Sequence, residues 1–214
     1  MTATSSGRRR GRPPKSDAGD TKELLLQAAL ALFAANGFEG TSVRDIARCV
    51  GLSESVLYAH FDSKRAIFEA VLAQLGPLSA VGLLEGGDPS DPPAFLRSLI
   101  ARAMEDWSSP QSRQLISLMA QDDLIHDPAL TSGIGAAVGS LAGLFERWIE
   151  AGQLAADLGS PFELAYALIS PVALARVLWL HNGAKPGEMA AARDRANRHA
   201  EFFVRAVFPD HSPR

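Results

Sequence analysis

An Asp or Ser followed directly by Pro recurs in this chain, at Asp91-Pro92, Ser109-Pro110, Asp127-Pro128 and Ser160-Pro161. A short polar side chain can accept hydrogen bonds from the free N–H groups of a first helical turn, and proline fits that turn because its missing N–H would have no partner there. Each pair therefore indicates the start of a helix. No segment alternates apolar and polar residues with the period of two that strands require. The sequence predicts an all-α protein.

The N-terminal third has equally clear helix boundaries. Residues 1–19 are mostly Ser, Gly, Arg and Pro, and we interpret them as a disordered basic arm. Residues 76–93 contain four glycines and Pro-Ser-Asp-Pro-Pro, which is typical of a connection. We expect an N-terminal three-helix head leading into a fourth helix over residues 20–78, and a larger C-terminal helical domain over residues 79–214. The helices expected in the head run from Asp20 to about Asn36, from Ser42 to Gly51, from Ser53, and from about Lys64 to Leu75.

Charge is distributed unevenly along the chain. The net charge is −3, but residues 1–75 hold 10 Lys/Arg and 8 Asp/Glu, whereas residues 76–214 hold 11 and 16. Five of the basic side chains lie within the first 15 residues, where there is no acid. A basic arm on an acidic body predicts that contact with a polyanion is confined to the N-terminal end.

The sequence also bears on the compartment. The only cysteine, Cys49, allows neither an intrachain disulfide nor a cysteine-based zinc site. The basic N-terminus is not followed by the apolar stretch of a secretory signal. The most membrane-like segment, Phe162 to Leu180, has a longest charge-free run of 12 residues, Leu164 to Ala175, which is short of the roughly 20 needed to span a bilayer. We expect a cytoplasmic protein without a membrane partner.

The region Val43 to Asp62 has the spacing of a helix-turn-helix. Ala47 is small enough for two helices to cross closely, Gly51 suits the positive φ of a tight turn, and Leu57 faces back into the core. Ordinary helical hairpins can have the same spacing. The side chains expected to face outward on the second helix are short or polar and suit a DNA major groove: Ser53, Glu54, Ser55, Tyr58, Ala59 and His60.

Three runs in this region resemble the head of TetR family transcriptional regulators: Thr41-Ser-Val-Arg-Asp-Ile-Ala-Arg, Val50-Gly-Leu-Ser and Leu57-Tyr-Ala-His-Phe-Asp-Ser-Lys. The resemblance is specific over about residues 21–70. It implies a homodimeric repressor that binds double-stranded DNA at a palindromic operator and is released by a small apolar or amphipathic effector. On matching positions it implies phosphate contacts by Ser42 and Arg44, groove contacts by Ser53, Glu54, Ser55, Tyr58 and His60, and a backbone contact by Lys64.

Two positions depart from the usual family pattern. Glu54 is acidic where a basic or small residue is common. It can accept a hydrogen bond from cytosine N4, or it can repel phosphate and lower affinity. Cys49 stands where a charged residue is usual, and a lone thiol without a resolving partner is weak evidence for a redox role.

The arm contains Arg10-Gly-Arg-Pro, which resembles the core of an AT-hook. Glycine and a proline-extended backbone allow a thin segment to lie along a minor groove, where Arg10 and Arg12 meet enhanced negative potential over A·T steps. The alternative is an unspecific basic tail that raises solubility. We expect DNA contact, because the arm directly precedes the head.

The C-terminal domain ends in two helices suited to pairing. Residues 160–180 are apolar nearly all round, and such a helix must be covered on every side. The last helix, about Glu188 to Phe208, repeats small and apolar residues at helical spacing. The resemblance implies that these helices pair with a second copy, although packing within one chain is the alternative. The interface residues predicted are Phe162, Tyr166, Trp179, Ala196, Ala200, Phe203 and Val207.

The middle of the C-terminal domain is rich in large apolar residues. The family resemblance implies an effector pocket here, although any one of these residues can equally be core. The predicted pocket residues are Met104, Trp107, Leu118, Met119, Phe145 and Trp148.

The alternatives to a DNA-binding regulator are an enzyme and a helical interaction module without DNA binding. The sequence has no nucleophile elbow, no phosphate loop and no His-Glu-x-x-His, and its five histidines have no ligand spacing. An interaction module has no need of a basic arm before a helix-turn-helix. We expect no catalytic residue, metal or cofactor.

Overall fold

The computed structural model describes residues 15–76, 79–121 and 124–209. Every regular element within these ranges is a helix, as predicted. The helices are α1 (Lys15–Asn36), α2 (Val43–Cys49), α3 (Glu54–Tyr58), α4 (Lys64–Leu75), α5 (Ser79–Glu85), α6 (Pro92–Trp107), α7 (Pro110–Gln121), α8 (Pro128–Glu150), α9 (Pro161–Trp179) and α10 (Pro186–Val207), with short 3-10 turns at Leu124–His126 and Ala156–Leu158.

Four of the predicted helix starts, at Ser42, Asp91, Asp127 and Ser160, are confirmed by their capping bonds. The Ser42 hydroxyl accepts a hydrogen bond from the Asp45 backbone N–H at 3.1 Å, and the Asp45 carboxylate accepts one from the Ser42 backbone at 3.3 Å. Ser160 forms the same reciprocal box at the start of α9. The Asp91 and Asp127 side chains accept bonds from the first turns of α6 and α8. The Asp-Pro and Ser-Pro pairs thus satisfy N–H groups that would otherwise have no partner.

Two segments differ from the expectation. Helix α1 begins at Lys15, so residues 15–19 are helical rather than part of the arm. A single glycine such as Gly19 costs a helix only about 1 kcal/mol relative to alanine, which the rest of the helix can offset. Helix α5 lies inside the segment expected to be a plain connection, because Leu83 and Leu84 pack against the C-terminal core and stabilise a helical turn there.

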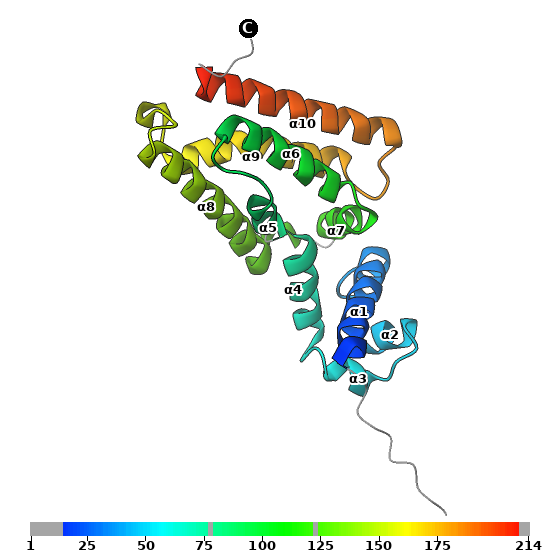
Figure 1. The fold of residues 1–214 in the computed structure, drawn as a ribbon. Coiled ribbons are helices and arrows are strands. Elements are labelled where there is room, and N and C mark those ends of the chain that lie inside the picture. The colour runs from blue at the N-terminus through cyan, green and yellow to red at the C-terminus, as the bar shows by residue number, and fades with distance from the viewer. Residues whose placement is uncertain (1–14, 77–78, 122–123, 210–214) are drawn as a thin grey trace, which may run out of the picture.

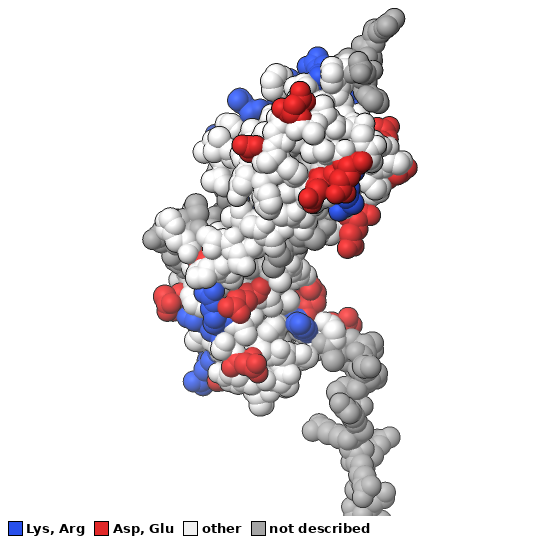
Figure 2. All heavy atoms as spheres, turned by 90° about the vertical axis from the view of Figure 1, so that its left-hand side faces the viewer, with Lys and Arg blue, Asp and Glu red and all other residues white. Residues whose placement is uncertain are grey.

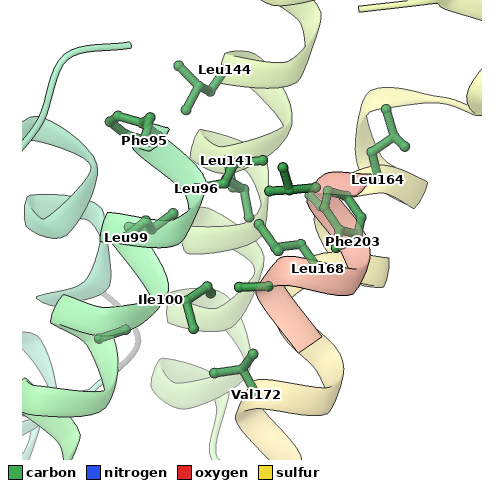
Figure 3. Packing of buried hydrophobic residues seen from close by; sticks show 14 of the residues in the cluster. Phe95, Leu96, Leu99, Ile100, Leu141, Leu144, Leu164, Leu168, Val172 and Phe203 are labelled. Atoms are coloured by element: carbon green, nitrogen blue, oxygen red, sulfur yellow. The ribbon is translucent and has the colours of Figure 1, made fainter. Parts of the chain in front are cut away.

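The molecule is elongated, with α1, α2 and α3 at one end and α6, α8, α9 and α10 at the other (Figure 1). We call α1–α4 the head and α5–α10 the body. Helix α4 runs from the tip of the head towards the body (Figure 1). The body core lies among α6, α8, α9 and α10, where Leu96, Leu141, Leu168 and Phe203 approach one another from four helices (Figure 3). This arrangement places the helix-turn-helix at one tip of the molecule.

The hydrophobic core of the head does not end with α4. Leu115 and Leu118 of α7 are fully buried in it, and Leu130 of α8 joins them. Helix α7 packs chiefly against α1. The head and the body therefore share a continuous apolar contact as well as the covalent connection through α4.

An ion pair ties the start of α4 to the start of α8. The Arg65 guanidinium donates two hydrogen bonds to the Asp127 carboxylate, at 2.5 and 2.8 Å. These bonds lower the pKa of Asp127, whose side chain is almost completely buried. Arg65 also donates to Glu69 at 2.8 Å, but that pair is exposed to solvent. The Arg65–Asp127 pair thus holds the head against the body.

Replacing Asp127 by Asn is expected to lower the free energy of unfolding at pH 7 by about 1 kcal/mol, because the cap is kept and the charge is lost. Arg65 is substantially exposed, so solvent screening limits the effect. Since folding depresses the pKa of Asp127, its contribution is present above the unfolded value of about 3.9 and is lost as the pH falls through the folded value. Urea unfolding of both proteins at neutral and acidic pH measures this.

The matched control is Glu69→Gln, which removes the exposed partner of the same arginine and is expected to cost less than about 0.5 kcal/mol. The two unfolding curves of the parent and Asp127→Asn should converge towards acidic pH. A difference that is the same at every pH would contradict the assignment of the stabilisation to the ionised carboxylate.

Candidate nucleic-acid interface and associated sites

Helices α2 and α3 form the predicted helix-turn-helix. Gly51 has a φ of 70°, a conformation that side-chain-bearing residues rarely adopt. The Leu52 N–H donates to the Ala47 carbonyl at 2.9 Å and closes the turn. Ala47 and Leu57 are fully buried where the two helices meet the head core. The three residues occupy the positions that the spacing predicted, and they fix the direction in which α3 presents its other side.

The opposite side of α3 is open to solvent. Tyr58 is 50% exposed, although its neighbour Leu57 is completely buried. Ser53, Glu54 and Ser55 are also exposed, and His60 is partly exposed. The Ser53 and Ser55 hydroxyl oxygens lie 2.8 Å apart at the N-terminal end of the helix. The face thus offers hydroxyl groups, one phenol and one carboxylate, which are groups that can bond to base edges or phosphates.

Glu54 is close to another predicted DNA-binding residue. The Arg44 Nε atom lies 3.8 Å from the Glu54 carboxylate, and both side chains are largely exposed. The two charges therefore offset one another at the surface between α2 and α3. A phosphate near Arg44 would compete with Glu54, so this acid weakens the attraction of α2 for a polyanion.

Lys64 has a structural role that the sequence did not reveal. Its ammonium group donates to the Phe38 carbonyl at 2.7 Å and lies 4.4 Å from the centre of the Phe38 ring. The Glu39 carboxylate is 3.7 Å away, and only 24% of the Lys64 side chain is exposed. Lys64 therefore fastens the start of α4 to the loop after α1, with a small part of its surface left for a phosphate.

The folded part of the head is not basic. Residues 15–76 hold six Lys/Arg and eight Asp/Glu. On the face shown in Figure 2, basic and acidic side chains are interspersed at the head end. Arg10 and Arg12 lie outside the described residues, in residues 1–14, which contribute four arginines and no acid. The positive charge of the N-terminal end thus belongs to the arm.

The body contains a cavity of about 480 Å³, lined by helices α5 to α9 and by Gly76. Of the six residues predicted to line a pocket, Trp107 and Met119 do so. Met104, Leu118, Phe145 and Trp148 are packed in the two cores instead. Trp148, for example, donates its indole N–H to the Pro89 carbonyl at 2.8 Å and packs edge-on against the Phe145 ring. A buried aromatic at helical spacing carries no signal that separates cavity from core.

Sequence reasoning missed Arg176, the one charged side chain among the described residues that line the cavity. Its guanidinium stacks 4.6 Å from the centre of the Trp107 ring and donates to the Leu75 carbonyl at 3.1 Å. Burial lowers the pKa of Arg176 to about 10, so it remains charged at neutral pH. A single arginine within the otherwise apolar end of α9 was the available signal.

The predicted interface residues divide into two groups. Phe162 and Tyr166 are more than half exposed on α9, and Trp179 is partly exposed. The other four are buried within this chain: Ala196, Ala200, Phe203 and Val207. They form the side of α10 that packs on α6 and α9, so the repeat that suggested an interface is the intramolecular core.

A stripe of apolar side chains remains uncovered on α9 and α10. On α9 it includes Phe162, Tyr166 and Leu174. Phe202 of α10 is 65% exposed and follows His199 by one turn, and the His199 ring nitrogen lies 3.1 Å from the Ala167 carbonyl of α9. The sequence prediction named the buried Phe203 and not the exposed Phe202, since adjacent phenylalanines fit a helical repeat almost equally well.

Helices α8 and α9 are also long and apolar enough to cross a membrane, which is weak evidence because core helices pass the same criterion.

Residues 25–71 match the family model described as bacterial regulatory proteins, tetR family. The chain is similar to the HTH-type transcriptional regulator RutR of Escherichia coli, with 31% identity over 137 residues that cover 63% of this chain and 64% of RutR. Over 48 residues it is 42% identical to IcaR, a negative transcriptional regulator of the biofilm operon icaADBC of Staphylococcus aureus, covering 22% and 26% of the two chains.

The fold as a whole is similar to that of SmeT, the repressor of the Stenotrophomonas maltophilia multidrug efflux pump SmeDEF. The TM-score is 0.71 at 22% identity, and the match covers 91% of this chain and 94% of SmeT. A complex of SmeT with triclosan matches with the same TM-score and identity over 90% and 93% of the two chains. At this identity the likeness establishes the shared fold.

Proposed function

We propose, for a chain whose N-terminal domain belongs to the tetR family of bacterial regulatory proteins, that the protein is a DNA-binding transcriptional regulator that acts as a repressor. The observation that carries the proposal is the exposed Tyr58 beside the buried Leu57, which turns the polar face of α3 away from the head core. The named relatives RutR and IcaR are regulators rather than enzymes, which favours this function over catalysis.

The proposed DNA contacts differ in kind. Ser53, Ser55 and Tyr58 face the major groove, and Ser42 and Arg44 approach phosphates at the start of α2. When Arg44 contacts a phosphate, Glu54 loses its attraction to Arg44. A hydrogen bond from a cytosine N4 group to the Glu54 carboxylate compensates for this loss, so cytosine is the base best suited to Glu54. His60 and Lys64 lie at the edge of the surface. Arg10 and Arg12 of the arm supply positive charge that the folded head lacks.

A second copy of this chain is the proposed partner of the uncovered apolar stripe on α9 and α10. Apolar patches of this kind on a water-exposed surface mark interaction sites. Two helices from each copy would form a four-helix interface around a two-fold axis. A two-fold dimer presents two α3 helices in opposite orientations, so the operator read by it is palindromic. The proposed contact with DNA implies that the protein acts in the cytoplasm.

The cavity in the body is the proposed effector site. Its volume of about 480 Å³ lies within the roughly 300–1,000 Å³ typical of small-molecule pockets. SmeT, which shares the fold, has been solved in complex with triclosan, an observation that favours a small-molecule site in this fold. Ligand binding is proposed to weaken operator binding through α4, the helix that joins the head to the body.

The function is tested by selecting genomic fragments that bind the purified protein and sequencing them. A regulator of the proposed type enriches a small set of sites with two-fold symmetry, and its affinity falls steeply as salt rises. An enzyme or a helical interaction module enriches no sequence. Absence of any enriched site at low salt would refute the proposal.

Tyr58→Ala is expected to weaken binding to the selected operator by roughly 10- to 100-fold, because Tyr58 is exposed and its loss removes DNA contact without opening the core. Fluorescence anisotropy with labelled operator measures the affinity, and a thermal melt monitors folding. The control is Glu146→Ala, an exposed change on α8 of the body, which should behave like the parent. Unchanged affinity of Tyr58→Ala would show that α3 is not the reading helix.

A further inference from the structure

The cavity in the body combines an apolar wall with one buried cation. Its described lining consists of Gly76, alanine and larger apolar side chains, with Trp107 and Arg176 as the only polar ones. Arg176 is 7% exposed, and Trp107 is 4% exposed. A buried guanidinium in such surroundings is expensive unless its N–H groups are bonded or a counter-charge is close.

Neither requirement is fully met by the described residues. The Arg176 Nη2 atom donates to the Leu75 carbonyl, but the Nε atom is buried without a hydrogen-bond partner. The Trp107 indole nitrogen, beside which the guanidinium stacks, is also buried without one. No described carboxylate lies within 4 Å of Arg176; Asp106 of α6 interacts with it only at longer range. Two buried donors without acceptors thus belong to neighbouring side chains that line the apolar cavity.

We propose that the cavity binds an amphipathic carboxylic acid, with its carboxylate at Arg176 and its apolar chain among residues such as Leu99, Ile100, Ile134 and Leu141. The proposal rests on the proposed function and deepens it by naming the class of effector. A carboxylate beside the guanidinium neutralises its positive charge. It accepts bonds from Nε and from the Trp107 N–H after a small shift of the two side chains, because both nitrogens are completely buried in this structure. A doubly charged phosphate would leave one negative charge uncompensated among apolar side chains, which disfavours that head group.

The same arginine connects the ligand to the helix that carries the head. Leu75 is the last residue of α4, and its carbonyl is one of the free acceptors at a helix end, where a cation is favourable. A carboxylate at Arg176 competes with this carbonyl for the guanidinium and removes its net charge. A bound carboxylic acid therefore weakens the hydrogen bond between Arg176 and the C-terminal end of α4, and this alters the position of the head.

The test uses decanoic acid and decan-1-ol, which share an alkyl chain and differ in the head group. Isothermal titration of the parent protein at neutral pH should show decanoate binding roughly 10- to 100-fold more tightly than the alcohol, the range for hydrogen bonds to charged groups. In Arg176→Met, which keeps an unbranched apolar side chain, this preference should disappear. Arg97→Met is the matched control, because Arg97 pairs with Glu201 at the surface and lies outside the cavity.

A second variant protects the test against misfolding of Arg176→Met. Trp107→Phe keeps an aromatic ring beneath the guanidinium and removes only the indole N–H, so it should reduce the preference for decanoate about tenfold or less. Decanoate should also lower operator affinity in the parent, and decan-1-ol should do so only at much higher concentration. Equal affinity of the parent for the two probes, no binding of decanoate, or an unchanged preference in folded Arg176→Met would each overturn the inference.

The outcomes separate this inference from the proposed function. If the protein selects no operator but discriminates between acid and alcohol through Arg176, the regulator proposal fails and the ligand class stands. If it binds an operator and treats the two probes alike, the regulator proposal stands and the ligand class fails.

Discussion

Phe202→Glu is expected to convert the protein from a dimer into a folded monomer. Phe202 is 65% exposed in the single chain, so a carboxylate there remains hydrated and leaves the fold intact. In the proposed dimer the same position is covered by the second copy, and burial of an unpaired charge costs several kcal/mol. The dimer dissociation constant should rise by at least about 100-fold, since every 1.4 kcal/mol is a factor of ten. Analytical ultracentrifugation across a range of concentrations measures it.

Two matched variants sharpen this result. Asn197→Glu adds the same charge to an exposed position on another side of α10 and should leave the dimer unchanged. Phe203→Ala removes a buried ring from the body core and should lower the free energy of unfolding by about 3–5 kcal/mol, whatever the oligomeric state. A parent protein that is already monomeric at micromolar concentration, or a Phe202→Glu protein that remains dimeric, would exclude the proposed interface.

Removal of residues 1–14 is expected to lower DNA affinity by up to about three orders of magnitude at physiological salt. These residues contain four arginines, whereas the rest of the head has more acids than bases. The slope of log affinity against log salt should flatten by about 0.9 for each phosphate that the arm neutralises, which is up to about 3.6 for four arginines. Thermal stability should hardly change, because the deletion stops short of α1.

The double variant Arg10→Ala with Arg12→Ala separates two modes of contact. If these arginines enter a minor groove, the variant reproduces most of the loss, and the loss is larger for operators with A·T-rich flanks. If the arm only neutralises phosphates, all flanking sequences lose affinity alike. Substitution of Arg8 and Arg9 by Ala provides a control with the same change in charge. A salt slope unaffected by the truncation would show that the arm does not contact DNA.

Local rules predicted the helix starts well. The short-range bonds of Ser42, Asp91, Asp127 and Ser160 depend on residues at most three positions away, so the sequence contains the whole interaction. The same holds for the turn at Gly51. Helix α5 depends instead on packing of Leu83 and Leu84 against a distant core, and the glycines around it suggested an irregular connection.

The functional sites were harder to predict, because a surface or a cavity is a property of the packed fold. Helical spacing indicated that α10 has an apolar side, but it did not show that α6 and α9 cover that side and leave Phe202 exposed. The pocket residues Trp107 and Met119 were found together with four core residues of similar chemistry. Arg176 acquires its meaning only because Trp107 and Leu75, far away in sequence, lie beside it.

The shared core of head and body has a consequence for recombination. The chain crosses from head to body at α4, yet the apolar contact that closes the head includes Leu115 and Leu118 of α7. A fragment cut after Gly76 would therefore expose the surface of α1 that α7 covers and would tend to aggregate. Exchange of reading heads between homologous proteins, whether in evolution or in engineered hybrids, must preserve the match between α1 and α7. The transferable unit is the head together with the α7 surface that seals it.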